Sequence, residues 1–287
     1  ENILSPDARA RWMRATFRPE DVWQYARELI ALEDQPAGGM QTLAYYALYR
    51  ATAMNSGVTV LLEGQGADEI LAGYGSYLPF FYRDLVREKR FVGIARFLTA
   101  RMMREGPWPL ARALAWRLLP RQAVSPAARA ARESLSVLNS EFTRRTRERG
   151  GARMFPRPFS SELLNAQYRD IRYTKLPRVL RTNDHISMHF SKELRVPYLD
   201  TRLVEFCFFL PDRFKIGPRM RKVLLQNAMR PYLPRALWER QKITFRSFQS
   251  EWLAKHLAGD VRGLFARGAS RSARYTDERA VERIIDE

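Results

Sequence analysis

A chain of 287 residues in which 46% of the side chains are hydrophobic and 12% are aromatic is too long and too apolar to be disordered, and it can bury a substantial core. Its longest apolar stretches, such as residues 206–210, are far shorter than the roughly 18 residues that a membrane span needs. The single cysteine, Cys207, cannot form an internal disulfide, so we expect a soluble protein of a reducing, cytoplasmic compartment.

Most of the positive charge is concentrated in one stretch. The formal net charge is +18, and residues 81–158 hold 18 Lys and Arg residues against 6 Asp and Glu residues. We interpret this stretch as the solvated faces of helices. A basic nucleic-acid-binding module is the alternative, and it would bind DNA or RNA in a strongly salt-dependent way. The absence of interleaved aromatic residues and of a known reader motif weighs against that alternative.

The first predicted elements alternate between helix and strand. Apolar residues at helical spacing predict helices over residues 18–32 and 40–55. The β-branched and Leu run of residues 58–62 predicts a strand that is buried on both faces of a parallel sheet. A turn, Gly64 to Gly66, and a helix beginning near Ala67 follow this strand. This order predicts an α/β fold.

The rest of the chain is predicted to be helical. Between residues 80 and 149 the helical patterns are rich in Arg and interrupted by prolines, which predicts a helical insertion. Further helices are expected over residues 165–181, 183–192 and 201–210. We therefore divide the chain into an α/β core, an Arg-rich helical insertion and a helical C-terminal part, at residues 1–80, 81–158 and 159–287.

The turn after the predicted strand is the first candidate for a functional site. Backbone N–H groups at such a turn point outward at an anion, and glycine permits its close approach. Asp68 and Glu69 would then lie beside a bound phosphate, which suits a Mg²⁺ ion that bridges carboxylate and phosphate oxygens. The pattern alone has an ordinary alternative, because acidic residues at a helix start also compensate the helix dipole.

Four segments resemble one known family. Residues 63–74, EGQGADEILAGY, are similar to the SGEGADELFGGY motif of asparagine synthetases. Residues 176–200, LPRVLRTNDHISMHFSKELRVPYLD, resemble a long block of that family, which VEFCFFLPDRFKI continues. Two shorter matches, RKVLLQNAM at 221–229 and RQKITF at 240–245, follow in the family's order. The resemblance implies a synthetase domain whose fold is a partial adenine-nucleotide alpha-hydrolase-like (ATP pyrophosphatase) parallel sheet with a largely helical C-terminal half.

The resemblance also implies a reaction in two steps. A substrate carboxylate, by default that of aspartate, attacks the α-phosphorus of ATP and releases pyrophosphate, and ammonia then displaces AMP from the acyl-adenylate. Because carboxylate and triphosphate repel each other, Mg²⁺ and a well-placed cation are needed. The expected cofactors are therefore ATP and Mg²⁺, and the expected ammonia source is a glutaminase domain that is not present in this chain.

The matched positions imply roles for individual residues. Lys242 matches the catalytic lysine of the family, and Gln65 occupies the position of its catalytic Glu. Asp68 matches the residue that contacts Mg²⁺ and pyrophosphate, and is the one expected metal ligand. The nucleotide pocket would be lined by Glu63, Gly64 and Gly66.

Four further residues of the matched segments are weaker candidates for substrate contacts: Asp184, Glu193, Arg195 and Lys222. Each has a structural alternative, since Glu193 and Arg195 could form a buried ion pair, Asp184 could be an acid at a helix start, and Lys222 could be a surface cation. His185, His189 and Glu193 would share one face of a single helix, as in a metal site. No HExxH pattern or second cluster supports metal binding there.

The sequence departs from the family at three points. An amide at Gln65 cannot accept a proton from ammonia as a carboxylate can, so the proton acceptor is open. Glu63 replaces a serine and brings a charge near ATP that needs compensation. The SGGxDS loop that holds pyrophosphate in this family does not occur, and the chain begins with Glu1. We therefore expect a truncated chain that does not turn over ATP by itself. A ligase with another acyl substrate, of the β-lactam synthetase or amidotransferase type, and a non-catalytic homologue are the alternatives.

Overall fold

The computed structural model describes residues 13–36, 38–105, 137–149, 154–218, 221–234, 249–265 and 275–286. These residues belong to two compact units. The first unit comprises residues 1–101 and 156–247, and the second comprises residues 102–155 and 248–287. The division into three parts at residues 80 and 158 stays a prediction.

A small parallel sheet lies in the first unit. β1 (Val60–Leu62) pairs with β2 (Glu193–Arg195), and Leu61 lies opposite Leu194. The fold is thus mixed α/β, mostly helical with a small parallel sheet. The expectation that β1 is buried on both faces is wrong. Val60 and Leu62 are 36% and 71% exposed, because β2 is the only strand that neighbours β1 among the described residues.

Two helices precede the sheet, as the sequence predicts. α1 (Val22–Glu33) follows a 3-10 turn, η1 (Pro19–Asp21), and ends at Asp34, whose backbone is left-handed. α2 (Met40–Asn55) has the predicted bounds. Its buried side chains include Leu43, Tyr46 and Tyr49, so this helix presents one face to the interior of the first unit.

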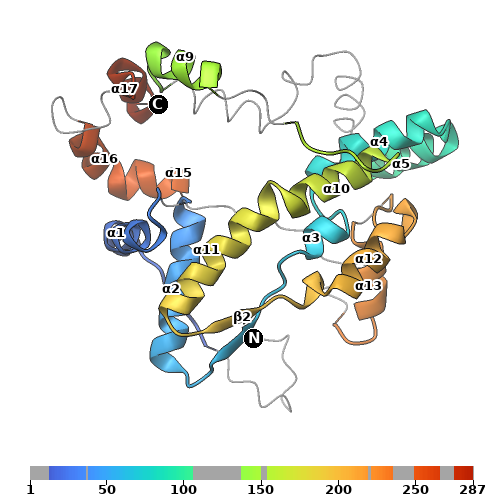
Figure 1. Cartoon of the computed structure of the whole chain (residues 1–287), viewed down its shortest axis with the longest axis horizontal. Helices are drawn as coiled ribbons and strands as arrows, with labels where there is room; N and C mark the ends of the chain where they lie inside the picture. Colours follow the sequence, from blue (N-terminus) through green and yellow to red (C-terminus); the bar gives the residue numbers. More distant parts are fainter. Residues whose placement is uncertain are drawn as a thin grey trace. The chain divides into compact units, whose positions relative to one another are not determined.

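The long C-terminal helices have other boundaries than predicted. α10 (Glu162–Arg172) ends where the N–H groups of Tyr173 and Thr174 both donate to the carbonyl of Arg169. α11 (Lys175–His189) therefore continues through the expected break at residue 182. In Figure 1 the chain passes from α11 directly into β2, which places Glu193 on a strand rather than on a helix. The C-terminal half, predicted to be largely helical, thus contains one short strand among its described residues.

Shorter elements make up the rest of the described part of the first unit. They are α3 (Ala67–Ile70), η2 (Gly75–Tyr77), α4 (Leu78–Arg87), η3 (Pro197–Leu199), α12 (Thr201–Phe209), η4 (Asp212–Phe214) and α13 (Val223–Met229). α12 confirms the helix predicted over residues 201–210, and the Asp200 carboxylate caps it by accepting from the N–H of Arg202.

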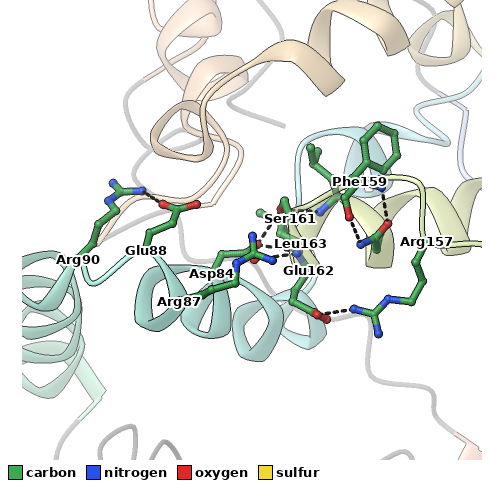
Figure 2. A network of polar contacts seen from close by, with 11 residues as sticks. Asp84, Arg87, Glu88, Arg90, Arg157, Phe159, Ser161, Glu162 and Leu163 are labelled. Carbon is green, nitrogen blue, oxygen red and sulfur yellow. Dashed lines mark hydrogen bonds and ion pairs between the residues drawn. The ribbon is translucent and has the colours of Figure 1, made fainter.

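A buried carboxylate of α4 holds the start of α10. Asp84 is fully buried and accepts hydrogen bonds from the N–H groups of Glu162 at 2.7 Å and Leu163 at 2.9 Å. It also accepts from the Ser161 hydroxyl at 2.7 Å. Figure 2 shows this network together with the ion pairs at its rim. Because the first N–H groups of a helix lack partners within the helix, Asp84 satisfies donors that would otherwise be buried without acceptors.

The second unit is helical where it is described. α5 (Phe91–Glu105) begins in the first unit and ends in the second, which also contains α9 (Ser140–Arg149), α15 (Gln249–Trp252), a π-helical turn η5 (Leu253–Leu257), α16 (Ala258–Phe265) and α17 (Glu278–Asp286). A single antiparallel bridge joins Leu138 to Thr276. Across the described ranges, no helix has both the length and the apolar composition that crossing a membrane requires.

Candidate functional site

The segment that follows β1 begins with a carboxylate whose two oxygens are both bound. Glu63 Oε1 accepts from the Tyr49 hydroxyl at 2.5 Å, and Glu63 Oε2 accepts from Asn183 Nδ2 at 2.9 Å. Tyr49 comes from α2 and Asn183 from α11, so three separate segments meet at this side chain. Burial and the Glu63 charge together raise the pKa of Tyr49, so Tyr49 stays a proton donor at neutral pH.

Gln65 contacts the same helix as Glu63. On a helix, residues four apart share a face. Accordingly Gln65 Nε2 donates to the hydroxyl of Tyr45 at 3.4 Å, one helical turn before Tyr49 on α2. Burial, with a contribution from Glu63, raises the pKa of Tyr45. Two tyrosines of α2 therefore contact Glu63 and Gln65, the two polar residues at which this sequence departs from the family motif.

Glycine is required at the turn into α3. Gly66 has φ +91°, and a Cβ atom there would lie 2.3 Å from Leu199 Cδ2. Gly64, by contrast, is exposed and would bring a Cβ only to 3.9 Å from the Tyr198 ring. α3 begins at Ala67, as the sequence predicts, and has four residues. The anion site at this turn stays a prediction.

Asp68 and Lys222 meet at the end of this turn. Lys222 Nζ lies 2.9 Å from Asp68 Oδ1, and the two side chains are 24% and 23% exposed. The partly exposed pair can be reached by solvent while each charge keeps an opposite partner. Gly73 makes room for it, because a Cβ atom there would lie 1.8 Å from Asp68 Oδ1. Two residues that the sequence predicts separately, one for metal and one for substrate, are thus brought together.

A buried polar layer lies beneath Asp68. The neighbouring Glu69 is buried, which raises the pKa of its carboxyl group, and it accepts from the Tyr74 hydroxyl at 2.9 Å. Lys175 Nζ lies 4.3 Å from the centre of the Tyr74 ring and 2.6 Å from Asp170 Oδ2. Burial alone would raise the pKa of Asp170, but its bonds to Lys175 and Arg169 lower that pKa below the ordinary value. These contacts hold the motif segment in place.

The remaining predicted residues lie elsewhere or outside the described residues. Asp184 is exposed in the interior of α11, so the interpretation of it as an acid at a helix start is wrong. Glu193 and Arg195 form an ion pair of 2.7 Å, but their side chains are 53% and 59% exposed. Two positions apart on a strand with an open face, they cannot be the predicted buried pair. Lys242 lies outside the described residues.

The expectation that His185, His189 and Glu193 share one face of a single helix is wrong. His185 Nδ1 lies 3.4 Å from Glu33 Oε1, and the ring of His189 stacks on Tyr46 at 6.2 Å. Glu193 is on β2 and not on the same helix. No group of three His, Cys, Asp or Glu side chains within the described part of the chain could hold a metal ion.

Sequence reasoning missed Tyr45, Tyr49, Asn183 and Gly73. The spacing of the two tyrosines on one face of the predicted helix 40–55 is a signal that could have indicated them. The final Gly-Tyr of the motif marks Gly73. Nothing in the sequence alone pairs Asn183 with Glu63.

Comparison with known proteins agrees over most of the chain. Residues 7–287 match the family described as asparagine synthase. An asparagine synthetase (glutamine-hydrolyzing) of Bacillus subtilis is 24% identical over 274 residues, which are 86% of this chain and 38% of that protein. Proteins of Mycobacterium bovis and Mycobacterium tuberculosis that provisionally carry the same name are 33% identical over 111 residues, 38% of this chain and 17% of theirs. The chain thus spans well under half the length of these relatives.

Proposed function

Since the chain belongs to the asparagine synthase family, we propose that it handles ATP within a ligase that activates a carboxylate and passes it to ammonia as an amide. The observation that carries this proposal is the Asp68–Lys222 pair, at 2.9 Å. It joins the motif after β1 to the start of α13, and it would offer a carboxylate to Mg²⁺ and a cation to the neighbouring phosphate group. Aspartate is the proposed acyl substrate, and glutamine-derived ammonia the proposed nitrogen source.

The donor set fits Mg²⁺ bound together with a nucleotide. Mg²⁺ is usually held by one or two carboxylates plus substrate phosphates and water, not by a cage of protein ligands. Asp68 supplies one carboxylate, and no three-residue ligand cluster accompanies it among the described residues. When bound, Mg²⁺ would neutralise charge on the phosphates; Asp68 would hold it, and Lys222 would contact the pyrophosphate.

The other residues of the turn would orient the nucleotide. Glu63 carries a charge that would repel ATP, but the hydrogen bonds that it accepts from Tyr49 and Asn183 disperse that charge. We assign Lys242 as a second cation for the departing pyrophosphate, on family resemblance alone. Gln65 would donate a hydrogen bond to the acyl-adenylate, so the proton of the attacking ammonia goes to another acceptor, such as water. The β1–β2 sheet would be part of an ATP-pyrophosphatase-type core.

Pyrophosphate release tests the proposal. The complete protein that carries this chain is supplied with ATP, Mg²⁺ and ammonia, and aspartate is compared with other carboxylates. Release that depends on aspartate and yields asparagine supports the proposal in full. Release with another carboxylate instead supports a ligase but excludes aspartate as its substrate. No release with any carboxylate, together with no binding of Mg²⁺-ATP, overturns the ligase and favours a non-catalytic homologue.

Variants of the pair sharpen this test. Asp68→Asn and Lys222→Met should each lower the rate of pyrophosphate release at least about 100-fold, because each removes charge stabilisation in the transition state. Glu141→Gln is the matched control, since Glu141 also forms ion pairs, with Arg144 and Arg145, but in the second unit. Equal rates of pyrophosphate release for Asp68→Asn and Glu141→Gln would show that the pair takes no part in the reaction.

A further inference from the structure

Lys215 is a cation with no exposed surface. It follows η4, it is 0% exposed, and its Nζ lies 5.6 Å from the centre of the Phe208 ring. Nζ donates to Gln167 Oε1 at 3.3 Å. Burying a lysine is unfavourable, and an apolar side chain of similar length would fill the same space without that cost. The proposed reaction assigns no role to this residue, so its burial needs another explanation.

Gln167 extends the contact to the turn that carries Asp68. This residue of α10 is also fully buried. Its Nε2 donates to the carbonyl of Glu69 at 2.5 Å and to the carbonyl of Ile70 at 2.9 Å. These carbonyls lie at the end of α3, where they have no acceptor role within the helix. The hydrogen bond from Lys215 to Gln167, and those from Gln167 to the two carbonyls, thus hold the backbone next to Asp68.

The main chain of Lys215 holds the other half of the pair. The N–H of Val223 donates to the carbonyl of Lys215 at 3.3 Å. Val223 follows Lys222, whose φ of 54° lies in the left-handed region. A lysine persists in that strained conformation only where its surroundings fix it.

We propose that Lys215 and Gln167 are positioning residues that fix Asp68 and Lys222 relative to each other. Lys215 holds the Asp68 turn with its side chain, through Gln167, and the start of α13 with its carbonyl. Neither residue touches the reacting atoms. The consequence for catalysis rests on the proposed function, whereas the geometric part does not.

The geometric part is tested by the coupling between Asp68 and Lys222. Asp68→Asn, Lys222→Met and the double variant are unfolded with urea, and the departure from additivity gives the coupling. The same set is then made with Lys215→Met. We expect the coupling to fall by at least about half, because the two side chains lose their common support. If Lys215→Met does not fold, Gln167→Met provides the second background. An unchanged coupling in the background that folds overturns the proposal.

A control background separates positioning from general loss of stability. Asp84→Asn also alters a fully buried polar residue of the first unit, but Asp84 contacts the start of α10 and not the Asp68 turn. We expect the coupling to survive there. An equal fall in both backgrounds would show that any buried polar change weakens the pair, and would overturn the proposal.

Activity gives a second readout in the complete protein. Lys215→Met should lower kcat about 10-fold with a smaller change in the KM for Mg²⁺-ATP, since misplacing the pair weakens charge stabilisation in the transition state. A Lys215→Met enzyme with the kcat of the native protein would contradict the catalytic consequence. If the native protein releases no pyrophosphate at all, the proposed function fails, while the coupling measurement still decides the positioning role.

Discussion

A Cβ atom on Gly73 would lie 1.8 Å from Asp68 Oδ1, a distance that no real pair of atoms adopts without a bond. It would also lie 2.4 Å from Lys222 Cε. The Asp68–Lys222 pair therefore occupies the space that a side chain on residue 73 would fill. The glycine directly before the tyrosine of the motif is needed for this packing, and not for an unusual backbone angle.

Gly73→Ala should consequently separate Asp68 from Lys222. Displacing a phosphate-binding group by about 1 Å can cost on the order of 100-fold in rate, and we expect a loss of that size in pyrophosphate release by the complete protein. Gly57→Ala is the matched control, because a Cβ there meets nothing within 4 Å. Native activity in Gly73→Ala would mean that the pair takes no part in the reaction.

A second carboxylate beside Glu63 should weaken nucleotide binding. Asn183→Asp removes the donor to Glu63 Oε2 and places two carboxylates at hydrogen-bond distance, where both cannot stay ionised without cost. We expect Mg²⁺-ATP to bind about 10-fold more weakly, as measured by calorimetric titration. Glu63→Gln in the same chain should restore most of the affinity. Failure of this rescue would show that the effect comes from the fold of α11 and not from charge.

Asp84→Ala should destabilise the first unit strongly. The change leaves the buried N–H of Leu163 and the partly buried N–H of Glu162 at the start of α10 without an acceptor, which costs about 3 kcal/mol in the free energy of unfolding. Asp200→Ala removes a partly exposed cap of α12 and should cost about 1 kcal/mol. Urea denaturation compares the two variants. Similar losses would mean that burial of the Asp84 network contributes nothing beyond ordinary capping.

Local patterns predicted those parts of the fold whose signals are local. The helix over residues 40–55 has clear apolar spacing with glycines before it and Asn55 at its end, and α2 has those bounds. β2 could not be predicted in this way. It has three residues, two of them charged, and becomes a strand only because it pairs with β1. The break between α10 and α11, by contrast, has a local signal, because Pro177 has no N–H to donate to the carbonyl of Tyr173, four residues earlier.

The site shows the same limit. Resemblance to the family indicated Asp68 and Lys222 one by one, but their contact joins segments that are far apart in the sequence. No periodicity encodes such a contact, since it depends on how the fold brings α3 and the start of α13 together. The compensation of Glu63 by Tyr49 and Asn183 likewise appears only once α2 and α11 are placed beside β1.

The charge of Lys215 should leave a signature in the pH dependence of stability. Burial lowers the pKa of Lys215 from 10.5 to about 8, and the nearby charges of Asp212 and Cys207 offset this only in part. In the unfolded chain the same lysine keeps its ordinary pKa. Between about pH 8 and 10.5 the unfolded state therefore binds more protons at this site than the folded state, so this residue makes stability rise with pH.

Lys215→Met removes that contribution and leaves the other titrating groups in place. Below about pH 8 the native protein carries the full cost of a buried charge, so the variant should gain most relative to it there. That gain should shrink as the pH rises towards 10.5, where the native lysine folds uncharged. Urea denaturation of both proteins at several pH values measures the difference, in which the tyrosines and other lysines cancel. A difference that stays constant with pH would show that Lys215 keeps its ordinary pKa when buried, and that Gln167 and Asp212 compensate its charge fully.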